Sequence, residues 1–261
     1  MSTEHTTVGF FDSGAGGLTV LAEARRAMPG AAYLFYADTD HVPYGTKTRE
    51  EVLRYARRAV SFLMERGAEA IVVACNTATS MAIDDLRAEF PLPIVGMEPA
   101  VKPAARVYPG SEILICATPL TIAGKKLHTL IDRSFPDGET PTLAALPGLV
   151  AMAEEERFDP DEASAYLEAA IPRHEGYAAV VLGCTHFGYF RDSFRRVFGN
   201  VDIIDGNRGT VRRLISLLGG TRGDGEGSVT IFESGRQVCD PGRLARYARL
   251  LARAQRAAEE N

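Results

Sequence analysis

This chain is organised around the stretch Ala70-Ile71-Val72-Val73-Ala74-Cys75-Asn76-Thr77, and a second version follows at Ala178-Ala179-Val180-Val181-Leu182-Gly183-Cys184-Thr185-His186. Each is a short apolar run, rich in β-branched residues, that ends in a cysteine followed by small polar residues. Such a run is typical of a buried strand in a parallel sheet, with the cysteine at the carboxyl end of the strand. One buried cysteine is commonplace in a protein core. Two with similar neighbours favour a shared role, and we expect two thiols that face one substrate.

Strands and helices are expected to alternate on both sides of the first cysteine. The apolar run at residues 7–11 leads through the Gly-rich turn Gly14-Ala15-Gly16-Gly17 into a helix that starts at Leu18. Thr48 and Glu51 have the spacing of a capping box and predict the start of another helix. Further strands are expected at residues 31–37, 91–96, 111–116, 201–206 and 229–232, and further helices at residues 125–131, 150–170 and 210–218 and from Pro241 onward. This alternation predicts an α/β fold with doubly wound parallel sheets.

The two halves of the chain repeat one arrangement. Residues 8–20 (strand, loop of small residues, Leu-Thr-Val) parallel residues 113–122 (strand, loop, Leu-Thr-Ile), and a cysteine strand follows each of them. We therefore expect two similar domains related by a pseudo-twofold axis: residues 1–97 with 207–261, carrying Asp12 and Cys75, and residues 98–206, carrying Cys184. Ligands of such sheets bind outside the carboxyl ends of the strands. The active site is accordingly expected in the cleft between the domains, with both cysteines facing it.

The bulk composition excludes several classes of protein. The chain has 261 residues, of which 46% are hydrophobic, which is enough for one large or two smaller cores. Its formal net charge of −5 offers no basic surface for nucleic acid or for an anionic membrane. Residues 1–7 lack the basic region and cleavage site of a signal peptide, and no apolar run reaches the length of about 18 residues that a membrane span needs. We expect a cytoplasmic protein with neither a nucleic-acid nor a membrane partner.

Cofactor and metal sites are not expected. Four cysteines in a chain of this length are too few for a disulfide scaffold and are expected to be free thiols. No C-x-x-C pair or cluster of His and Cys has the spacing of a zinc site. The Gly-rich turn has neither the G-x-G-x-x-G spacing nor the lysine of a phosphate-binding loop.

A pair of thiols on opposite sides of a substrate suits the inversion of a tetrahedral carbon. One group removes a proton from one face and the other returns a proton to the opposite face, without a cofactor. Each cysteine is predicted at a strand-to-helix junction, where unpaired N–H groups favour a thiolate. His186 can hydrogen-bond to the thiol of Cys184 or act on the substrate. Asp12, at the tip of the first strand, can orient a substrate ammonium or assist a thiol.

Five segments resemble the signature blocks of the glutamate racemases, the cofactor-independent members of the aspartate/glutamate racemase group. The segments occur in family order at residues 9–17, 43–45, 74–78, 96–100 and 182–186. The resemblance implies proton removal and return at Cα of glutamate, with Cys75 and Cys184 as the two bases. It further implies a supply of D-glutamate for peptidoglycan, no cofactor, and a fold that allows a homodimer.

The resemblance also assigns the remaining residues of the site. A family glutamate that assists the second half of the site matches Glu154, with Glu155 and Glu156 as neighbouring alternatives, and joins Cys75, Cys184, Asp12 and His186 as catalytic. The positions that match the family's substrate contacts are Asp12, Ser13, Tyr44, Gly45, Asn76, Thr77, Thr118, Thr121, Thr185 and His186. Without the resemblance, the charged run at residues 154–157 is expected to be a solvated helix face. The Arg-rich C-terminal helix is expected to be an amphipathic surface helix.

Some features leave alternatives open. Residues 187–190 replace an aromatic–Pro–Leu segment of many family members, and residues 231–235 replace a Thr-Gly strand ending. The residues do not measure pocket depth, so an aspartate racemase is the nearest rival. A thiol redox protein would join Cys75 and Cys184 in a reversible disulfide, and an inactive binding protein would tolerate the loss of either cysteine. Cys116 and Cys239 lack the polar neighbours and are expected to be structural.

Overall fold

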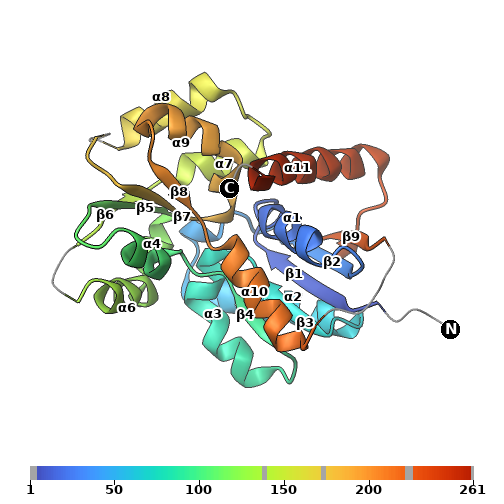
Figure 1. Cartoon of the computed structure of the whole chain (residues 1–261). Coiled ribbons are helices and arrows are strands. Elements are labelled where there is room, and N and C mark those ends of the chain that lie inside the picture. The colour runs from blue at the N-terminus through green and yellow to red at the C-terminus, as the bar shows by residue number, and fades with distance from the viewer. Residues whose placement is uncertain (1–4, 137–139, 172–174, 221–225, 260–261) are drawn as a thin grey trace.

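The computed structural model describes residues 5–136, 140–171, 175–220 and 226–259 and contains two sheets (Figure 1). The first sheet has six strands in the order β10-β9-β2-β1-β3-β4. Its strands are β1 (Thr7–Asp12), β2 (Ala32–Ala37), β3 (Ala70–Val73), β4 (Ile94–Gly96), β9 (Ser228–Glu233) and β10 (Arg236–Gln237). The second sheet has four strands in the order β6-β5-β7-β8. These are β5 (Ile113–Ala117), β6 (Thr142–Ala145), β7 (Ala179–Gly183) and β8 (Asp202–Ile204).

Neighbouring strands run parallel, apart from the antiparallel pair of β9 and β10. The predicted α/β fold with two parallel sheets is therefore confirmed. The order β2-β1-β3-β4 in the first sheet recurs as β6-β5-β7-β8 in the second. The two cysteine strands, β3 and β7, occupy equivalent places in these orders, which agrees with the internal repeat in the sequence.

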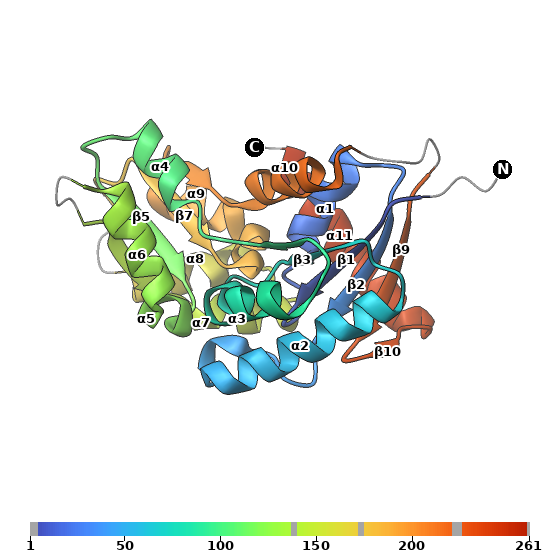
Figure 2. The ribbon, with the colours of Figure 1, turned by 90° about the horizontal axis from the view of Figure 1, so that it is seen from below.

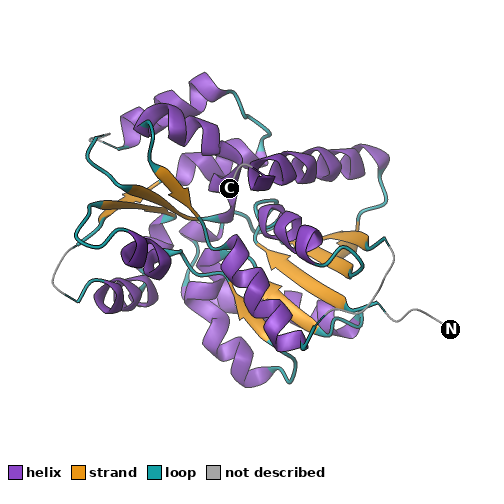
Figure 3. Ribbon diagram, in the orientation of Figure 1, coloured by secondary structure: helices purple, strands orange, loops and turns teal. Residues whose placement is uncertain are grey.

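Helices flank both sheets (Figure 3). In chain order the first helices are α1 (Leu18–Ala27), α2 (Arg49–Glu65), α3 (Asn76–Glu89), α4 (Val101–Val107), α5 (Pro119–Ala123) and α6 (Lys125–Ser134), with the 3-10 turn η1 (Tyr44–Thr46) before α2. They are followed by α7 (Pro147–Glu154), α8 (Pro160–Ala170), α9 (Arg191–Phe198), α10 (Asn207–Leu218) and α11 (Pro241–Glu259), with the 3-10 segment η2 (Thr185–Phe190) before α9. Figure 2 shows α2 and α3 on one face of the first sheet and α1 and α10 on the other. Helices α10 and α11 both pack against α1.

The largest hydrophobic cluster runs through both sheets. It contains Phe10 and Val72 of the first sheet together with Leu114 and Val180 of the second. These side chains are fully buried, and burial of apolar surface is the main stabilising contribution in such a core. The carboxyl ends of β3 and β7 are thus carried on one continuous core.

Local signals predicted most elements well, because caps and periodicity act over a few residues. The capping box is confirmed: Thr48 Oγ1 accepts the N–H of Glu51, and the Glu51 carboxylate accepts the N–H of Thr48 at 2.8 Å. Strand β6 was missed, since residues 143–149 carry only a weak pattern. It is a short edge strand of small and half-buried residues, and its pairing with β5 gives it its conformation. Helices α4 and α9 were also missed, and parts of the loops predicted at residues 136–142 and 219–227 lie outside the described residues.

The C-terminal helix is the amphipathic surface helix that the sequence predicts, with one buried face. Helix α11 packs against α1 and buries Tyr247, Leu250 and Ala254. Its inner face belongs to the largest hydrophobic cluster, so only its outer face is solvated. Over the described ranges, no helix combines the length and the apolar composition that crossing a membrane requires.

Candidate active site

Cys75 lies at the tip of β3 and caps the N-terminus of α3. Its Sγ accepts the N–H of Ala78 at 3.4 Å and donates to Ser13 Oγ at 3.6 Å. Burial, followed by the nearby charge of Asp12, raises the pKa of the Cys75 thiol to about 12. The helix N-terminus was expected to favour a thiolate, but its single N–H contact does not offset the loss of water around the sulfur. Cys75 is therefore a neutral thiol in this arrangement.

Cys184 lies at the tip of β7, directly before η2. His186 Nδ1 is 3.7 Å from Cys184 Sγ, within hydrogen-bonding distance for sulfur. The Gly-rich turn of the first half packs on this segment: a Cβ on Gly16 would lie 2.4 Å from His186 Nδ1 and 2.5 Å from Thr185 Oγ1. Only glycine fits this approach, which brings the first half of the chain against the second half of the site.

Asp12 ends β1 and is fully buried. Its Oδ2 accepts the N–H of Gly17 at 2.8 Å and closes the Gly-rich turn, while Oδ1 has no hydrogen-bond partner among the described residues. A Cβ on Gly17 would lie 2.7 Å from Asp12 Cβ, so this position also needs glycine. Burial raises the pKa of Asp12, and the positive charge of His186 opposes this. The backbone N–H groups of Gly17 and Gly14 also act to lower this pKa.

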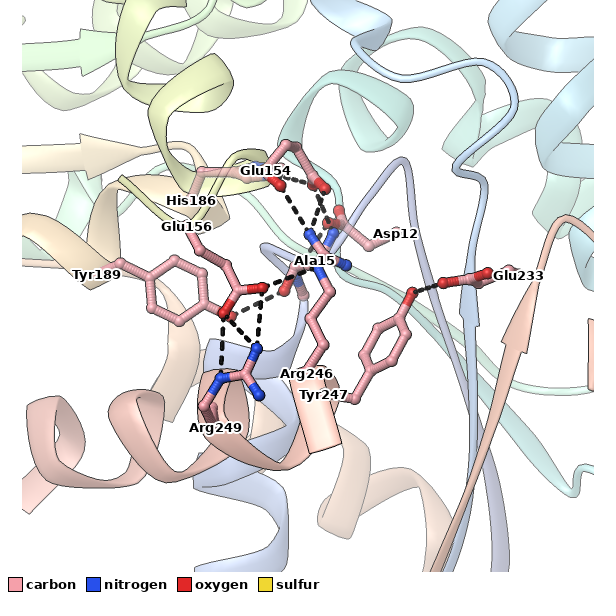
Figure 4. A network of polar contacts seen from close by, with 11 residues as sticks. Asp12, Ala15, Glu154, Glu156, His186, Tyr189, Glu233, Arg246, Tyr247 and Arg249 are labelled. Atoms are coloured by element: carbon pink, nitrogen blue, oxygen red, sulfur yellow. Dashed lines mark hydrogen bonds and ion pairs between the residues drawn. The ribbon is translucent and has the colours of Figure 1, made fainter. Parts of the chain in front are cut away.

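Glu154 is the one of the three consecutive glutamates that contacts His186 (Figure 4). Its Oε1 accepts hydrogen bonds from His186 Nε2 and from the N–H of Ala15, each at 2.7 Å. Glu155 and Glu156 pair with arginine side chains instead. The solvated helix face expected for this run is wrong for Glu154, because the end of α7 turns this side chain inward onto η2, where it is 17% exposed.

Glu154 and His186 form a charged pair. Burial acts to raise the pKa of Glu154, but the hydrogen bond and the charge of His186 outweigh it and lower this pKa to about 2. Burial acts to lower the pKa of His186, but its contacts with Cys184 and Glu154 raise this pKa well above the usual value. His186 is therefore an imidazolium that donates from Nε2 to Glu154 and from Nδ1 to Cys184.

Three buried hydroxyl groups join the two halves of the chain. Thr77 Oγ1 on α3 lies 2.9 Å from Thr118 Oγ1 and 3.2 Å from Thr121 Oγ1, both at α5. Thr118 also donates to Thr121 at 3.0 Å. Gly45 of η1 packs on this cluster, since a Cβ there would lie 2.9 Å from Thr118 Cβ. Residues separated by some 40 positions or more thus share one wall of the site.

Asn76 and Tyr44 complete the predicted set. Asn76 is buried, and its Nδ2 has no hydrogen-bond partner within the described part of the chain. Tyr44 donates from its hydroxyl to Asp38 at 2.6 Å, and Asp38 also accepts from Ser234 Oγ at 2.9 Å. Asp38 and Ser234 were not predicted from the sequence. Asp38 directly follows β2, much as Asp12 ends β1. This position at the carboxyl end of a strand could have identified Asp38 from the sequence.

The predicted residues thus approach one another through a chain of contacts across the two halves. A cavity of about 10 Å³ borders Cys184 and Asn76 but not Cys75. A larger cavity of about 450 Å³ lies between α3 and α6 and reaches Asn76 and Thr121, but neither cysteine lines it. Cys75 lines neither of these cavities, so the candidate site is defined by the two thiols and their polar contacts. Among the described residues, no group of three or more His, Cys, Asp or Glu side chains is arranged to bind a metal.

The charged pair predicts a pH-dependent effect of Glu154→Gln. The contribution of Glu154 to stability is lost as the pH falls from about 4.3 towards the lowered pKa, and that of His186 is lost as the pH rises from about 6.5 through the raised pKa. The substitution should therefore lower the free energy of unfolding most between about pH 4.3 and pH 6.5, where both groups are charged in the folded and the unfolded state. Denaturant titration at a series of pH values measures this. Imidazole NMR should show His186 protonated at neutral pH in the parent protein and with a lower pKa in the variant. An unchanged His186 pKa would contradict the pairing.

Known proteins resemble this chain over nearly its whole length. The family model for Asp/Glu/Hydantoin racemases matches residues 17–214. The glutamate racemase of Campylobacter curvus is 49% identical over 258 residues, covering 94% of this chain and 96% of the relative. That of Halothermothrix orenii is 48% identical over 251 residues, covering 94% and 98%. The crystal structure of Escherichia coli glutamate racemase in complex with L-glutamate and the activator UDP-MurNAc-ala has a TM-score of 0.80 at 29% identity, covering 94% of this chain and 96% of that one.

Two α/β sheets carry cysteines at the tips of the equivalent strands β3 and β7. On the match to the family model and to these relatives, the chain belongs to the Asp/Glu/hydantoin racemase family.

Proposed function

We propose that this protein is a glutamate racemase, which interconverts L- and D-glutamate and supplies D-glutamate for peptidoglycan. The observation that carries the proposal is the pair of buried thiols at the tips of the equivalent strands β3 and β7. The similarity to curated glutamate racemases, which extends over nearly the full length of the chain, supports the proposal.

Two unpartnered polar atoms suit the head of an amino acid. Asp12 Oδ1 is a buried acceptor and Asn76 Nδ2 a buried donor, and leaving such atoms unpaired is costly. A substrate ammonium would satisfy the first and a carboxylate the second. Nearby hydroxyl groups and N–H donors would then complete the contacts, from Ser13, Tyr44, Gly45, Thr77, Thr118, Thr121, Thr185 and His186.

The two cysteines exchange protons with Cα from opposite faces. The thiolate of one takes the Cα proton and becomes a thiol, the electron pair stays on the substrate as a carbanion, and the other thiol protonates the opposite face and becomes the thiolate. Cys75 and Cys184 exchange these tasks for the other enantiomer. The imidazolium of His186 stabilises negative charge on Cys184, whereas Cys75 has the neutral partner Ser13. A substrate ammonium at Asp12 would favour the thiolate of Cys75.

The two half-sites belong to two parts of the chain. We assign residues 1–97 with 207–261 to the Cys75 half-site and residues 98–206 to the Cys184 half-site. Helices α10 and α11 pack on α1, which supports the assignment of residues 207–261 to the same domain as residues 1–97. Cys75 and Cys184 are both free and each has its own polar partner, so no observation favours a redox disulfide.

The proposal is tested by incubating the protein in D₂O with L-glutamate and, separately, with L-aspartate, without added cofactor. We expect deuterium at Cα of glutamate together with loss of optical rotation, measured by NMR and polarimetry. Exchange with aspartate alone would make the protein an aspartate racemase. Exchange with neither amino acid would refute a two-thiol racemase.

A further inference from the structure

Helix α11 reaches the candidate site through Arg246. Its Nη2 donates to the backbone oxygen of Glu154 at 2.8 Å and lies 3.3 Å from Glu154 Oε2 (Figure 4). Its Nε lies 3.3 Å from Glu156 Oε1. The Arg246 side chain is 21% exposed, so these contacts are largely shielded from water.

The Glu154 carboxylate is held from three separate segments. Oε1 receives the N–H of Ala15 in the Gly-rich turn and Nε2 of His186 in η2, and Oε2 faces Arg246 in α11. With partners on both oxygens, the plane of the carboxylate is defined. The plane of the His186 ring, and the direction of its Nδ1 towards Cys184, follow from that of the carboxylate.

We propose that Arg246 is a positioning residue for the Cys184 half-site, acting on His186 through Glu154. The inference rests on the proposed function. It gives the C-terminal helix a role in proton transfer by Cys184, which acts on one enantiomer. Without Arg246, Oε2 of Glu154 has lost its partner and the carboxylate can rotate. His186 then no longer holds its N–H on the sulfur that must carry the charge.

Other contacts of α11 separate this task from the docking of the helix. Tyr247 donates to Glu233 at 3.0 Å, and Arg243 pairs with Glu233 at 2.7 Å. Buried Leu250 and Ala254 anchor the inner face. The helix is therefore expected to stay in place when Arg246 is replaced.

Several titratable groups surround the pair that Arg246 orients. Cys184 and Glu154 contact His186 directly, and Asp12 approaches it from β1. Tyr189 and Tyr247 face Glu154 from η2 and α11, and both have raised pKa values because they are buried, so they are neutral. The positive charge of Arg246 lies beside Oε2, the second oxygen of Glu154, and compensates its negative charge.

The test must measure the effect of a substitution on each half-site separately, and racemisation rates do not provide this. Enantiomers have equal free energy, so kcat/KM for the two directions stays equal in every variant. Elimination from 3-chloroglutamate is not limited in this way: loss of HCl gives an enamine that water converts to 2-oxoglutarate and ammonia. The enantiomer still consumed by Cys75→Ala is the one that Cys184 deprotonates.

The experiment compares Arg246→Met, Arg246→Lys and the matched control Arg249→Met, whose arginine pairs with Glu156 and is 62% exposed. Arg246→Met should slow elimination from the Cys184 enantiomer about tenfold, the scale of one hydrogen bond to a charged group, and leave the other enantiomer at the parent rate. Arg246→Lys should recover part of the loss, and Arg249→Met should show none. Loss of the Arg246 cation by itself acts to raise the pKa of His186. We expect this pKa to fall in Arg246→Met, measured by NMR, because the weaker hydrogen bond from a rotating Glu154 carboxylate outweighs the lost charge.

Equal loss for both enantiomers, or the same loss in Arg249→Met, would make Arg246 structural and overturn the proposal. If the parent protein neither racemises glutamate nor eliminates HCl, the proposed function fails. The His186 pKa still tests the positioning role without activity: a fall in Arg246→Met supports it, and an unchanged or raised pKa overturns it. Thermal unfolding of each variant shows whether the fold is retained.

Discussion

Replacing either Cys75 or Cys184 with alanine is expected to lower racemisation by about 1,000-fold, within the range that a single acid–base group contributes. Each thiol acts on one face of Cα, and neither face has a substitute group of similar reach. Cys75 is 5% exposed and Cys184 8% exposed, so bulk water does not replace the lost proton donor. Polarimetry and the appearance of deuterium at Cα in D₂O measure the loss.

The two alanine variants should differ in one respect. With 3-chloroglutamate, each should still eliminate HCl from a single enantiomer, and the two variants should select opposite enantiomers. The control is Cys239→Ala, which removes the exposed thiol and should leave racemisation unchanged. Racemisation at the parent rate in either Cys75→Ala or Cys184→Ala would exclude paired bases.

Asp12→Asn is expected to lower kcat/KM for glutamate by about 100-fold, as for the loss of a buried hydrogen bond between charged groups. The amide keeps an oxygen for the N–H of Gly17, so the Gly-rich turn should persist. Its NH₂ group then occupies the place of Oδ1 and repels the substrate ammonium. Steady-state kinetics in both directions measure the effect.

The form of the Asp12→Asn defect identifies the role of the carboxylate. A raised KM at constant kcat indicates ammonium binding, whereas a lowered kcat with slower elimination from the Cys75 enantiomer indicates assistance to that thiol. Asp40→Asn is the matched control, because Asp40 is 46% exposed and pairs with Arg236. Unchanged kinetics in Asp12→Asn would remove Asp12 from the site.

Much of the fold could be predicted because its signals are local. The alternation of β-branched runs with helical periodicity, and the capping box of Thr48 and Glu51, involve contacts over a few residues. Strand β6 has no such signal: its residues are small, and the hydrogen bonds of β5 give it its conformation. The positions of the two cysteines at strand tips were likewise predictable, as they follow directly from the strands.

The protonation of Cys75 was not predictable in the same way. A cysteine at a helix N-terminus indicates a lowered pKa, yet burial raises it to about 12. Burial depends on residues that folding packs together from distant positions: Cys75 shares a hydrophobic cluster with Phe11, Tyr44 and Phe232. The same holds for Asp38 and Ser234, which are 196 positions apart and meet behind Tyr44.

The sequence by itself determined the order of strands and helices, the two thiols at equivalent strand tips and the set of polar residues beside them. Only the tertiary structure decided which of three adjacent glutamates meets His186, and that Arg246 of a predicted surface helix holds it. The physical reason is range. Caps, turns and periodicity act between near neighbours along the chain, whereas desolvation and ion pairing depend on groups that folding brings together from distant positions.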